Sequence, residues 1–87
     1  IMVNGFSASA SELLAATLQD YNRAVIVGST TFGKGTGQQI LPFPDKPGAS
    51  LDNAKAILKV TADRLYRITG KSYQHKGVEP DIRLVDI

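Results

Sequence analysis

The distribution of apolar residues predicts a strand, a helix and a second strand near the start of the chain. An apolar run at residues 1–3 ends at an Asn-Gly pair and is typical of the end of a buried strand. Helical spacing follows over about residues 9–21. The apolar run at residues 24–27, rich in β-branched side chains and closed by a glycine, predicts a strand covered on both faces. Together these elements predict one βαβ unit with two parallel strands.

The predicted helix has a clear start and an apolar stripe. Its first residues, Ser9-Ala10-Ser11-Glu12, fit a capping box, in which the first and fourth residues each use a side chain to bind the backbone N–H of the other. We expect one stripe of the helix to face inward, because its apolar residues recur at helical spacing. The stripe consists of Leu13, Leu14, Ala16, Leu18 and Tyr21, and the residues expected outside it are Glu12, Gln19 and Asp20.

Turn residues divide the rest of the chain. Ser29–Gly37 contains three of the eight glycines and is expected to be a loop. Gln39–Phe43 predicts a short strand, and Asp45–Asn53 predicts an exposed, mobile loop. Apolar and polar residues then alternate over Leu58–Ile68, which predicts a long half-buried strand interrupted near Arg64. The fold class is therefore α/β, a βαβ unit plus additional strands, followed by a tail.

The composition narrows the possible functions. Of the 87 residues, 43% are hydrophobic and 21% are charged, as in an ordinary small globular protein, and the net charge is +2. A charge this small, without a basic block, does not favour nucleic acid as a partner. The absence of cysteine excludes a thiol nucleophile and a Cys-ligated metal. The sequence contains no run of about 18 apolar residues, so it predicts no transmembrane helix. The chain also opens without a signal-peptide pattern.

Residues suited to chemistry gather between the first predicted strand and the helix. This segment contains Ser7, Ser9 and Ser11. Sites in α/β sheets form at the carboxyl ends of the strands. A helix N-terminus there favours a developing alkoxide, and its free N–H groups can hold an oxyanion. One of these serines is therefore a candidate nucleophile, although serines are also ordinary capping and turn residues.

A serine nucleophile needs a base, and two residues could serve. His75 is the only histidine, but it lies in the polar tail, where an exposed side chain is the simpler interpretation. Lys34 fits better, because a helix of about 11 residues and a returning strand of about five residues each cover roughly 16 Å. The chain is then back beside Ser9 when it reaches Lys34. Lysine acts as a base where burial or a nearby cation keeps its amine neutral; a mobile loop lysine is the alternative.

The same loop also matches a phosphate-binding pattern. Gly28–Lys34 reads GxxxxGK and follows a predicted strand, as in a P-loop. However, Gly35 stands where a serine or threonine would bind Mg²⁺. The glycines and the proline that follow also oppose the long helix whose N-terminus would hold the phosphates. We therefore do not expect nucleotide binding.

Several segments together carry a family resemblance. They are NGFSASASE at residues 4–12, QDY at 19–21, RAVIVG at 23–28, TFGKGT at 31–36 followed by Gln38, and KGVEPDI at 76–82. In this order and at this separation they resemble the C-terminal processing peptidases, also called tail-specific proteases. The similarity extends over nearly the whole chain.

The resemblance implies an activity and its residues. The nucleophile falls on Ser9, the general base on Lys34, a glutamine that orients the lysine on Gln38, and one oxyanion-hole N–H on Ala10. It also implies a partial crotonase-like fold and peptide-bond hydrolysis through an acyl-enzyme, without metal or cofactor. The substrates would be proteins with accessible C-termini, and the location would be outside the cytoplasm, in the bacterial periplasm.

Two parts of the family's pattern have no counterpart in this sequence: the PDZ domain and an upstream catalytic-core segment that supplies a second oxyanion-hole N–H. Residues 1–87 are therefore expected to form the C-terminal part of the catalytic domain and to be inactive alone. The alternative is a non-catalytic module that binds a partner or self-associates through open strand edges. We also expect the Ser29–Gly37 loop to be displaced or poorly ordered, with Ser9 and Lys34 beyond hydrogen-bonding distance.

Overall fold

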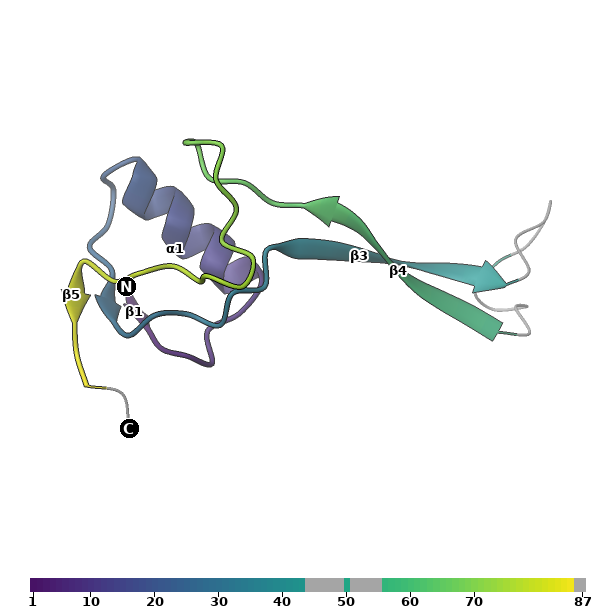
Figure 1. Ribbon diagram of the computed structural model, residues 1–87, viewed down its shortest axis with the longest axis horizontal. Helices are drawn as coiled ribbons and strands as arrows, with labels where there is room; N and C mark the ends of the chain where they lie inside the picture. The colour runs from purple at the N-terminus through teal and green to yellow at the C-terminus, as the bar shows by residue number, and fades with distance from the viewer. Residues whose placement is uncertain (44–49, 51–55, 86–87) are drawn as a thin grey trace.

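A small α/β body carries a long two-stranded hairpin that projects from it (Figure 1). The computed structural model describes residues 1–43, 50 and 56–85. Its elements are β1 (Met2–Val3), α1 (Ala10–Asp20), β2 (Val27–Gly28), β3 (Thr36–Phe43), β4 (Ala56–Arg64) and β5 (Ile82–Arg83). No helix within these described ranges is long and apolar enough to cross a membrane.

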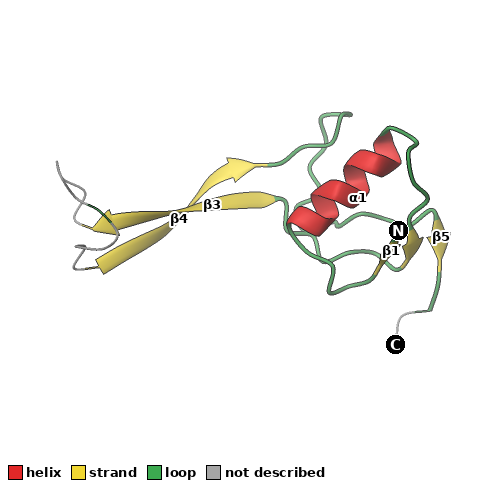
Figure 2. Cartoon of the chain, turned by 180° about the vertical axis from the view of Figure 1, so that it is seen from behind, coloured by secondary structure: helices red, strands yellow, loops and turns green. Residues whose placement is uncertain are grey.

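The body is built on a three-stranded parallel sheet in the order β1-β2-β5. Val3 pairs with Gly28 and Val27 pairs with Ile82, so the predicted βαβ unit is confirmed. The third strand, β5, comes from the tail and was not predicted, because two residues are too few to show a period. The helix α1 lies beside this sheet (Figure 2).

The helix begins and ends where the sequence predicts, but it packs through a different face. Its buried residues are Glu12, Ala15 and Ala16, whereas Leu14 is 58% exposed. Apart from Ala16 and the partly buried Leu18, the predicted inward stripe is therefore wrong, as is the outward position of Glu12. The alanines allow close approach to the rest of the body, because they add almost no bulk. Ala15 packs with Val3 and Ile26, and Ala16 packs with Tyr73 and Val78.

The central strand β2 is shorter than the apolar run predicts. Ile26, just before it, is fully buried, but Val25 is 55% exposed, so this segment is not covered on both faces throughout. Gly28 lies so close to β1 that a Cβ atom built on it would stand 1.8 Å from the carbonyl oxygen of Val3, and its φ is +136°. Only glycine fits both conditions.

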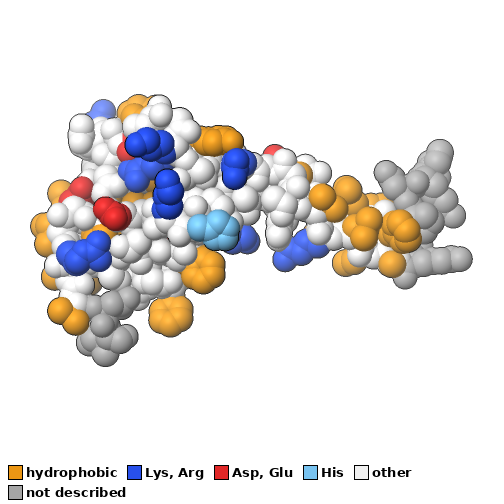
Figure 3. All heavy atoms as spheres, in the orientation of Figure 1, with side chains coloured by type: hydrophobic (Ala, Val, Ile, Leu, Met, Phe, Trp, Pro, Cys, Tyr) orange, Lys and Arg blue, Asp and Glu red, His pale blue; other side chains and the backbone are white. Residues whose placement is uncertain are grey.

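The hairpin consists of β3 and β4, paired antiparallel with a register shift at Gly37/Gln38. The interruption predicted near Arg64 is the end of β4, but the half-buried character predicted for this strand is wrong, since β4 is exposed throughout. Apolar side chains gather on the outer part of the hairpin (Figure 3): Ile40, Leu41, Phe43, Ile57, Leu58 and Val60. The loop predicted over Asp45–Asn53 lies outside the described residues, apart from Ser50.

Candidate active site

Ser9 occupies the sharp turn between β1 and α1 and is the N-cap residue of the helix, as predicted. Its backbone has φ 59° and ψ −120°, a combination that residues with a Cβ atom seldom adopt. Such strain costs on the order of 1–3 kcal/mol and persists only where the surroundings impose it, most often at functional sites. A strained strand-to-helix turn is also the geometry that exposes the nucleophilic serine in α/β-hydrolases.

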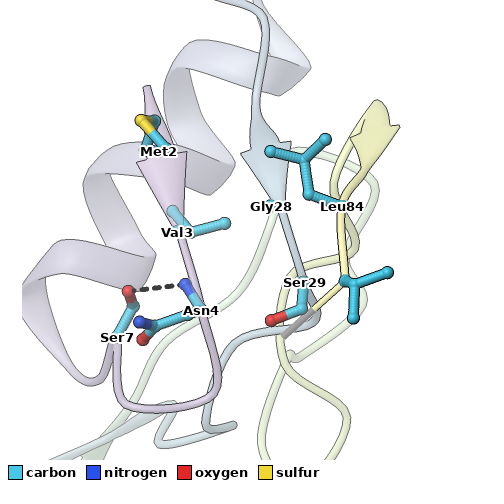
Figure 4. Close-up of a pocket in the computed structure, with 8 residues that line it drawn as sticks. Met2, Val3, Asn4, Ser7, Gly28, Ser29 and Leu84 are labelled. Atoms are coloured by element: carbon cyan, nitrogen blue, oxygen red, sulfur yellow. Dashed lines mark hydrogen bonds between the residues drawn. The ribbon is translucent and has the colours of Figure 1, made fainter. Parts of the chain in front are cut away.

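The two neighbouring serines have structural partners. The Ser7 hydroxyl accepts a hydrogen bond from the backbone N–H of Asn4 at 3.1 Å (Figure 4). The Ser11 hydroxyl donates to the carbonyl of Ala8 at 2.7 Å. Both therefore act as turn-forming residues, and Ser9 is the serine that the local geometry sets apart. Ala10 follows it as the first helical residue, so its N–H has no acceptor within the helix.

The carboxylate of Glu12 joins the turn that contains Ser9 to the Ser29–Gly37 loop, called the Lys34 loop below. Its Oε2 accepts hydrogen bonds from the backbone N–H groups of Ser9 at 2.9 Å and Lys34 at 2.8 Å. The backbone nitrogens of Ser9 and Lys34 therefore lie within two hydrogen-bond lengths of each other. Its Oε1 accepts bonds from the Thr31 hydroxyl at 2.5 Å and the N–H of Gly33 at 2.6 Å. Glu12 is fully buried, and it brings the two predicted catalytic residues side by side.

Hydrogen bonds hold the Ser29–Gly37 loop in place, so the expectation that it is poorly ordered is wrong, whereas its displacement stays a prediction. Besides the bonds to Glu12, the N–H of Phe32 donates to the carbonyl of Ser7 at 2.9 Å, and the N–H of Thr31 donates to the carbonyl of Val78 at 3.1 Å. The packing that we expected from an upstream segment comes from the helix and the tail instead. Lys34 is half-buried, and, as expected, no hydrogen bond within the described residues joins its side chain to the Ser9 hydroxyl.

Hydrogen bonding sets the charge state of this cluster. Burial raises the pKa of Glu12, but the bonds from Thr31, Gly33, Lys34 and Ser9 lower it more, so the pKa of this carboxyl lies below its ordinary value. Nearby, burial and then the charge of Glu12 raise the pKa of Tyr73, which keeps that phenol neutral. Glu12 is thus a carboxylate at neutral pH even though water does not reach it.

Two other predicted residues lie on the surface. Gln38 is exposed on β3, directly after the register shift in the hairpin, so its proposed contact with Lys34 stays a prediction. His75 is exposed, as expected of a tail histidine.

The structure does not have the geometry of a phosphate-binding P-loop. After Lys34 the chain enters strand β3 instead of a helix, so the loop does not lead into the helix N-terminus that holds the phosphates in a P-loop. In the part of the chain that the structure describes, no group of three or more histidine, cysteine, aspartate or glutamate residues is placed so that it could hold a metal ion.

A hollow of about 360 Å³ lies along the carboxyl ends of β1 and β2 (Figure 4). It opens beside the turn that leads to Ser9, at the sheet edge where sites in α/β folds form. Its lining residues are Met2, Val3, Asn4, Ser7, Gly28, Ser29, Leu84 and Val85. The candidate nucleophile therefore stands next to this hollow, not in it.

Two structural residues do not follow from the apolar pattern: Glu12 at the site and Arg67 at the far end of α1. Periodicity places Glu12 on the helix surface, although its place in the capping box is a signal that it binds backbone N–H groups. Arg67 was not singled out either, yet its guanidinium binds both carboxylate oxygens of Asp20, with Nη2 2.6 Å from Oδ1. This pair ties the residues after β4 to the end of α1, and the hydrogen bond from Arg67 lowers the pKa of Asp20.

Comparison with known proteins places the chain in a family. Residues 1–84 match the family described as Peptidase family S41. The chain belongs to peptidase family S41. It is 46% identical over 90 aligned residues to the tail-specific protease of Haemophilus influenzae, covering 100% of this chain and 12% of that protein. The carboxy-terminal-processing protease of Bartonella bacilliformis is 43% identical over 82 residues, covering 94% of this chain and 17% of that protein.

The fold is also shared with a solved protease structure. The photosystem II D1 C-terminal processing protease superposes with a TM-score of 0.77 at 36% identity, covering 95% of this chain and 19% of that one. The family predicted from the sequence is therefore confirmed. The chain spans less than a fifth of the length of each of these three proteins.

Replacing Glu12 by alanine is expected to loosen the Lys34 loop. The N–H groups of Ser9, Gly33 and Lys34 and the Thr31 hydroxyl would lose their acceptor, and each such group costs about 1–3 kcal/mol while it stays buried. We expect the free energy of unfolding to fall by at least about 3 kcal/mol and amide hydrogen exchange over residues 31–35 to accelerate. Chemical denaturation and exchange mass spectrometry measure both, with the exposed Glu79→Ala as control. A Glu12→Ala chain as stable as the control would contradict this role.

The carboxylates of Glu12 and Asp20 predict that acid lowers the stability of the chain. The pKa values of Glu12 and Asp20 are lowered by folding, so both groups stabilise the chain above their unfolded pKa values of about 4. This stability is lost as the pH falls through the lower, folded values. We expect the free energy of unfolding to decrease steadily below about pH 4, and less steeply in Glu12→Gln, which removes one titrating group. Equal slopes for the two chains would show that Glu12 does not contribute.

Proposed function

We propose that this chain is the C-terminal part of the catalytic domain of a tail-specific serine endopeptidase, with a partial crotonase-like fold. One observation carries the proposal: the backbone N–H groups of Ser9 and Lys34 bind the same oxygen of Glu12. A serine in a strained turn at a helix N-terminus and a lysine on an adjoining loop form the combination needed for a serine–lysine dyad. The proposed longer protein that carries this chain is called the parent protease.

The proposed mechanism begins with a rotation of the Lys34 side chain toward Ser9. The neutral amine takes the proton from the Ser9 hydroxyl as its oxygen attacks the substrate carbonyl carbon. The N–H of Ala10 and a second donor from the upstream part of the catalytic domain hold the resulting oxyanion. The C–N bond then breaks, and the lysine ammonium gives its proton to the leaving amine. In deacylation Lys34 takes a proton from water as the water oxygen attacks the acyl carbon. The ester C–O bond to Ser9 then breaks, and the lysine ammonium returns its proton to the Ser9 oxygen. Gln38 orients the lysine in both steps.

The substrates that we propose are proteins recognised by their C-termini. The names of the H. influenzae and B. bacilliformis relatives, tail-specific and carboxy-terminal-processing protease, support this class. A PDZ domain elsewhere in the parent protease would capture the substrate's C-terminus. Because these relatives are bacterial, and the tail-specific proteases that the chain resembles work outside the cytoplasm, we propose a periplasmic location.

A covalent probe tests the proposal. A fluorophosphonate that reacts with activated serines is added to the parent protease, and peptide mass spectrometry locates the adduct. We expect labelling at Ser9, and loss of labelling in Lys34→Ala, because the serine is then no longer activated. Matched controls are Ser7→Ala and Ser11→Ala, which should label as the wild type does. If the parent protease hydrolyses no protein substrate and Ser9 stays unlabelled, the proposed function is wrong.

A second candidate, a self-associating module, is favoured by the apolar side chains exposed along β3 and β4. A two-stranded hairpin is marginal in water by itself, and open strand edges pair readily with another chain. Sedimentation of the 87-residue chain distinguishes a monomer from an assembly. Replacing Leu41 and Leu58 together by threonine should return an assembly to monomers; an assembly that survives this change would use another surface.

A further inference from the structure

The tail segment at residues 72–78 packs directly on the Lys34 loop. The N–H of His75 donates to the carbonyl of Gly33 at 2.8 Å, and the N–H of Val78 donates to the Thr31 hydroxyl at 2.7 Å. A Cβ atom built on Gly77 would stand 2.3 Å from the carbonyl oxygen of Thr31, so the two backbones touch. The segment therefore forms one wall of the loop that carries the proposed base.

Within this wall, Gln74 makes a side-chain contact next to the lysine. Its Oε1 accepts a hydrogen bond from the N–H of Gly35 at 2.5 Å. Because an N–H needs an acceptor, the carbonyl oxygen of the amide must be the atom that faces Gly35. Glu12 holds the N–H groups of Gly33 and Lys34, so three consecutive N–H groups around the base are bound by side chains from two separate segments.

The backbone around Gln74 is fixed in a tight turn. The N–H of Gly77 donates to the carbonyl of Tyr73 at 2.8 Å, and His75 has a φ of +64°. The N–H of Gln74 itself donates to the Ser72 hydroxyl at 3.1 Å, and the ring of Tyr73 is almost fully buried beside α1. The amide of Gln74 is thus presented from a rigid base, whereas Gln38 stands on the exposed hairpin.

From this geometry we propose that Gln74 is a positioning residue for Lys34. It fixes the peptide bond on the C-terminal side of the lysine, as Glu12 fixes the one on the N-terminal side. The direction in which the Lys34 side chain leaves the backbone follows from these two peptide planes. This inference rests on the proposed function, because it assigns Gln74 a part in aligning the base of the dyad.

Two variants of the parent protease separate the hydrogen bond from the shape of the side chain. Gln74→Met keeps the length but removes the acceptor, and Gln74→Glu keeps an acceptor for Gly35. In Gln74→Met we expect kcat to fall about 10- to 100-fold with KM unchanged, because misplacement of a reacting group by about 1 Å costs that much. Gln74→Glu should recover most of the rate, with its pH–rate profile moved to higher pH, since the added negative charge favours the ammonium form of Lys34. The control is Gln39→Met, an exposed glutamine on β3.

Hydrogen exchange gives a readout that does not depend on activity. The amide of Gly35 should exchange faster in Gln74→Met and at the wild-type rate in Gln74→Glu. Wild-type kcat and exchange in Gln74→Met would overturn the inference, and so would equal losses in both variants, because shape alone would then matter. If the wild-type parent protease cleaves nothing, the proposed function fails, and unchanged Gly35 exchange still refutes the contact by itself.

Discussion

Replacing Ser9 by alanine in the parent protease is expected to abolish peptide hydrolysis. The loss of the nucleophile of a serine protease lowers kcat on the order of 10⁶-fold, because only binding and oxyanion stabilisation remain. Active-site titration and steady-state kinetics on an unfolded protein substrate measure this effect. The Glu12 bonds to Ser9 involve its backbone N–H, so the loop around Lys34 should keep its structure in the variant.

Matched serine variants test whether the right hydroxyl has been chosen. Ser7→Ala and Ser11→Ala remove hydroxyls that bind the backbone of the turn, so they should lower stability slightly while most of the rate remains. Ser9→Gly should be inactive but more stable than Ser9→Ala by about 1 kcal/mol, because glycine tolerates the positive φ at this position. An active Ser9→Ala enzyme, or a dead Ser7→Ala enzyme that remains folded, would refute the assignment.

Replacing Lys34 by arginine should be almost as damaging. Arginine keeps the positive charge but does not release its proton in a protein, so it cannot act as a base. We expect kcat/KM to fall at least about 10⁴-fold at every pH, as when the base that activates a nucleophilic serine is removed. Circular dichroism and exchange over residues 31–35 should stay unchanged, because the bond from the backbone N–H of residue 34 to Glu12 remains.

The histidine provides the matching negative control. The side chain of His75 is exposed, and its structural contact is made by its backbone N–H to Gly33. His75→Ala should therefore retain most of the wild-type rate and the same pH–rate profile. A Lys34→Arg enzyme with wild-type activity, or a His75→Ala enzyme without any, would rule out the serine–lysine dyad.

The sequence predicts the features of the fold that depend on residues close together along the chain. The helix bounds follow from the capping residues and the 3.6-residue period, and the parallel pairing of β1 with β2 follows from a helix between two apolar runs. The return of the chain to Ser9 at Lys34 follows from the rise of a helix and a strand. Each of these inferences needs only distances along the chain.

What the sequence did not reveal depends on contacts between distant residues. Glu12 has a polar side chain, so periodicity placed it outside, and only its partners at residues 31–34 explain its burial. Gln74 is separated from Gly35 by 39 residues, and no local pattern pairs them. The alternation in β4 correctly indicated a strand, but alternation alone does not say whether anything covers its apolar face.

The hairpin has a closed base, and this separates its length from the chemistry of the site. The N–H of Leu65 donates to the carbonyl of Gly35 at 2.8 Å, where β3 and β4 leave the body. The paired residues beyond that bond extend away from the body (Figure 1), so we expect a longer or shorter pair of strands to leave Lys34 in place. An engineered protease of this kind would carry a new binding loop between β3 and β4, while the hydrogen bonds from Ser9, Gly33 and Lys34 to Glu12 stay unchanged.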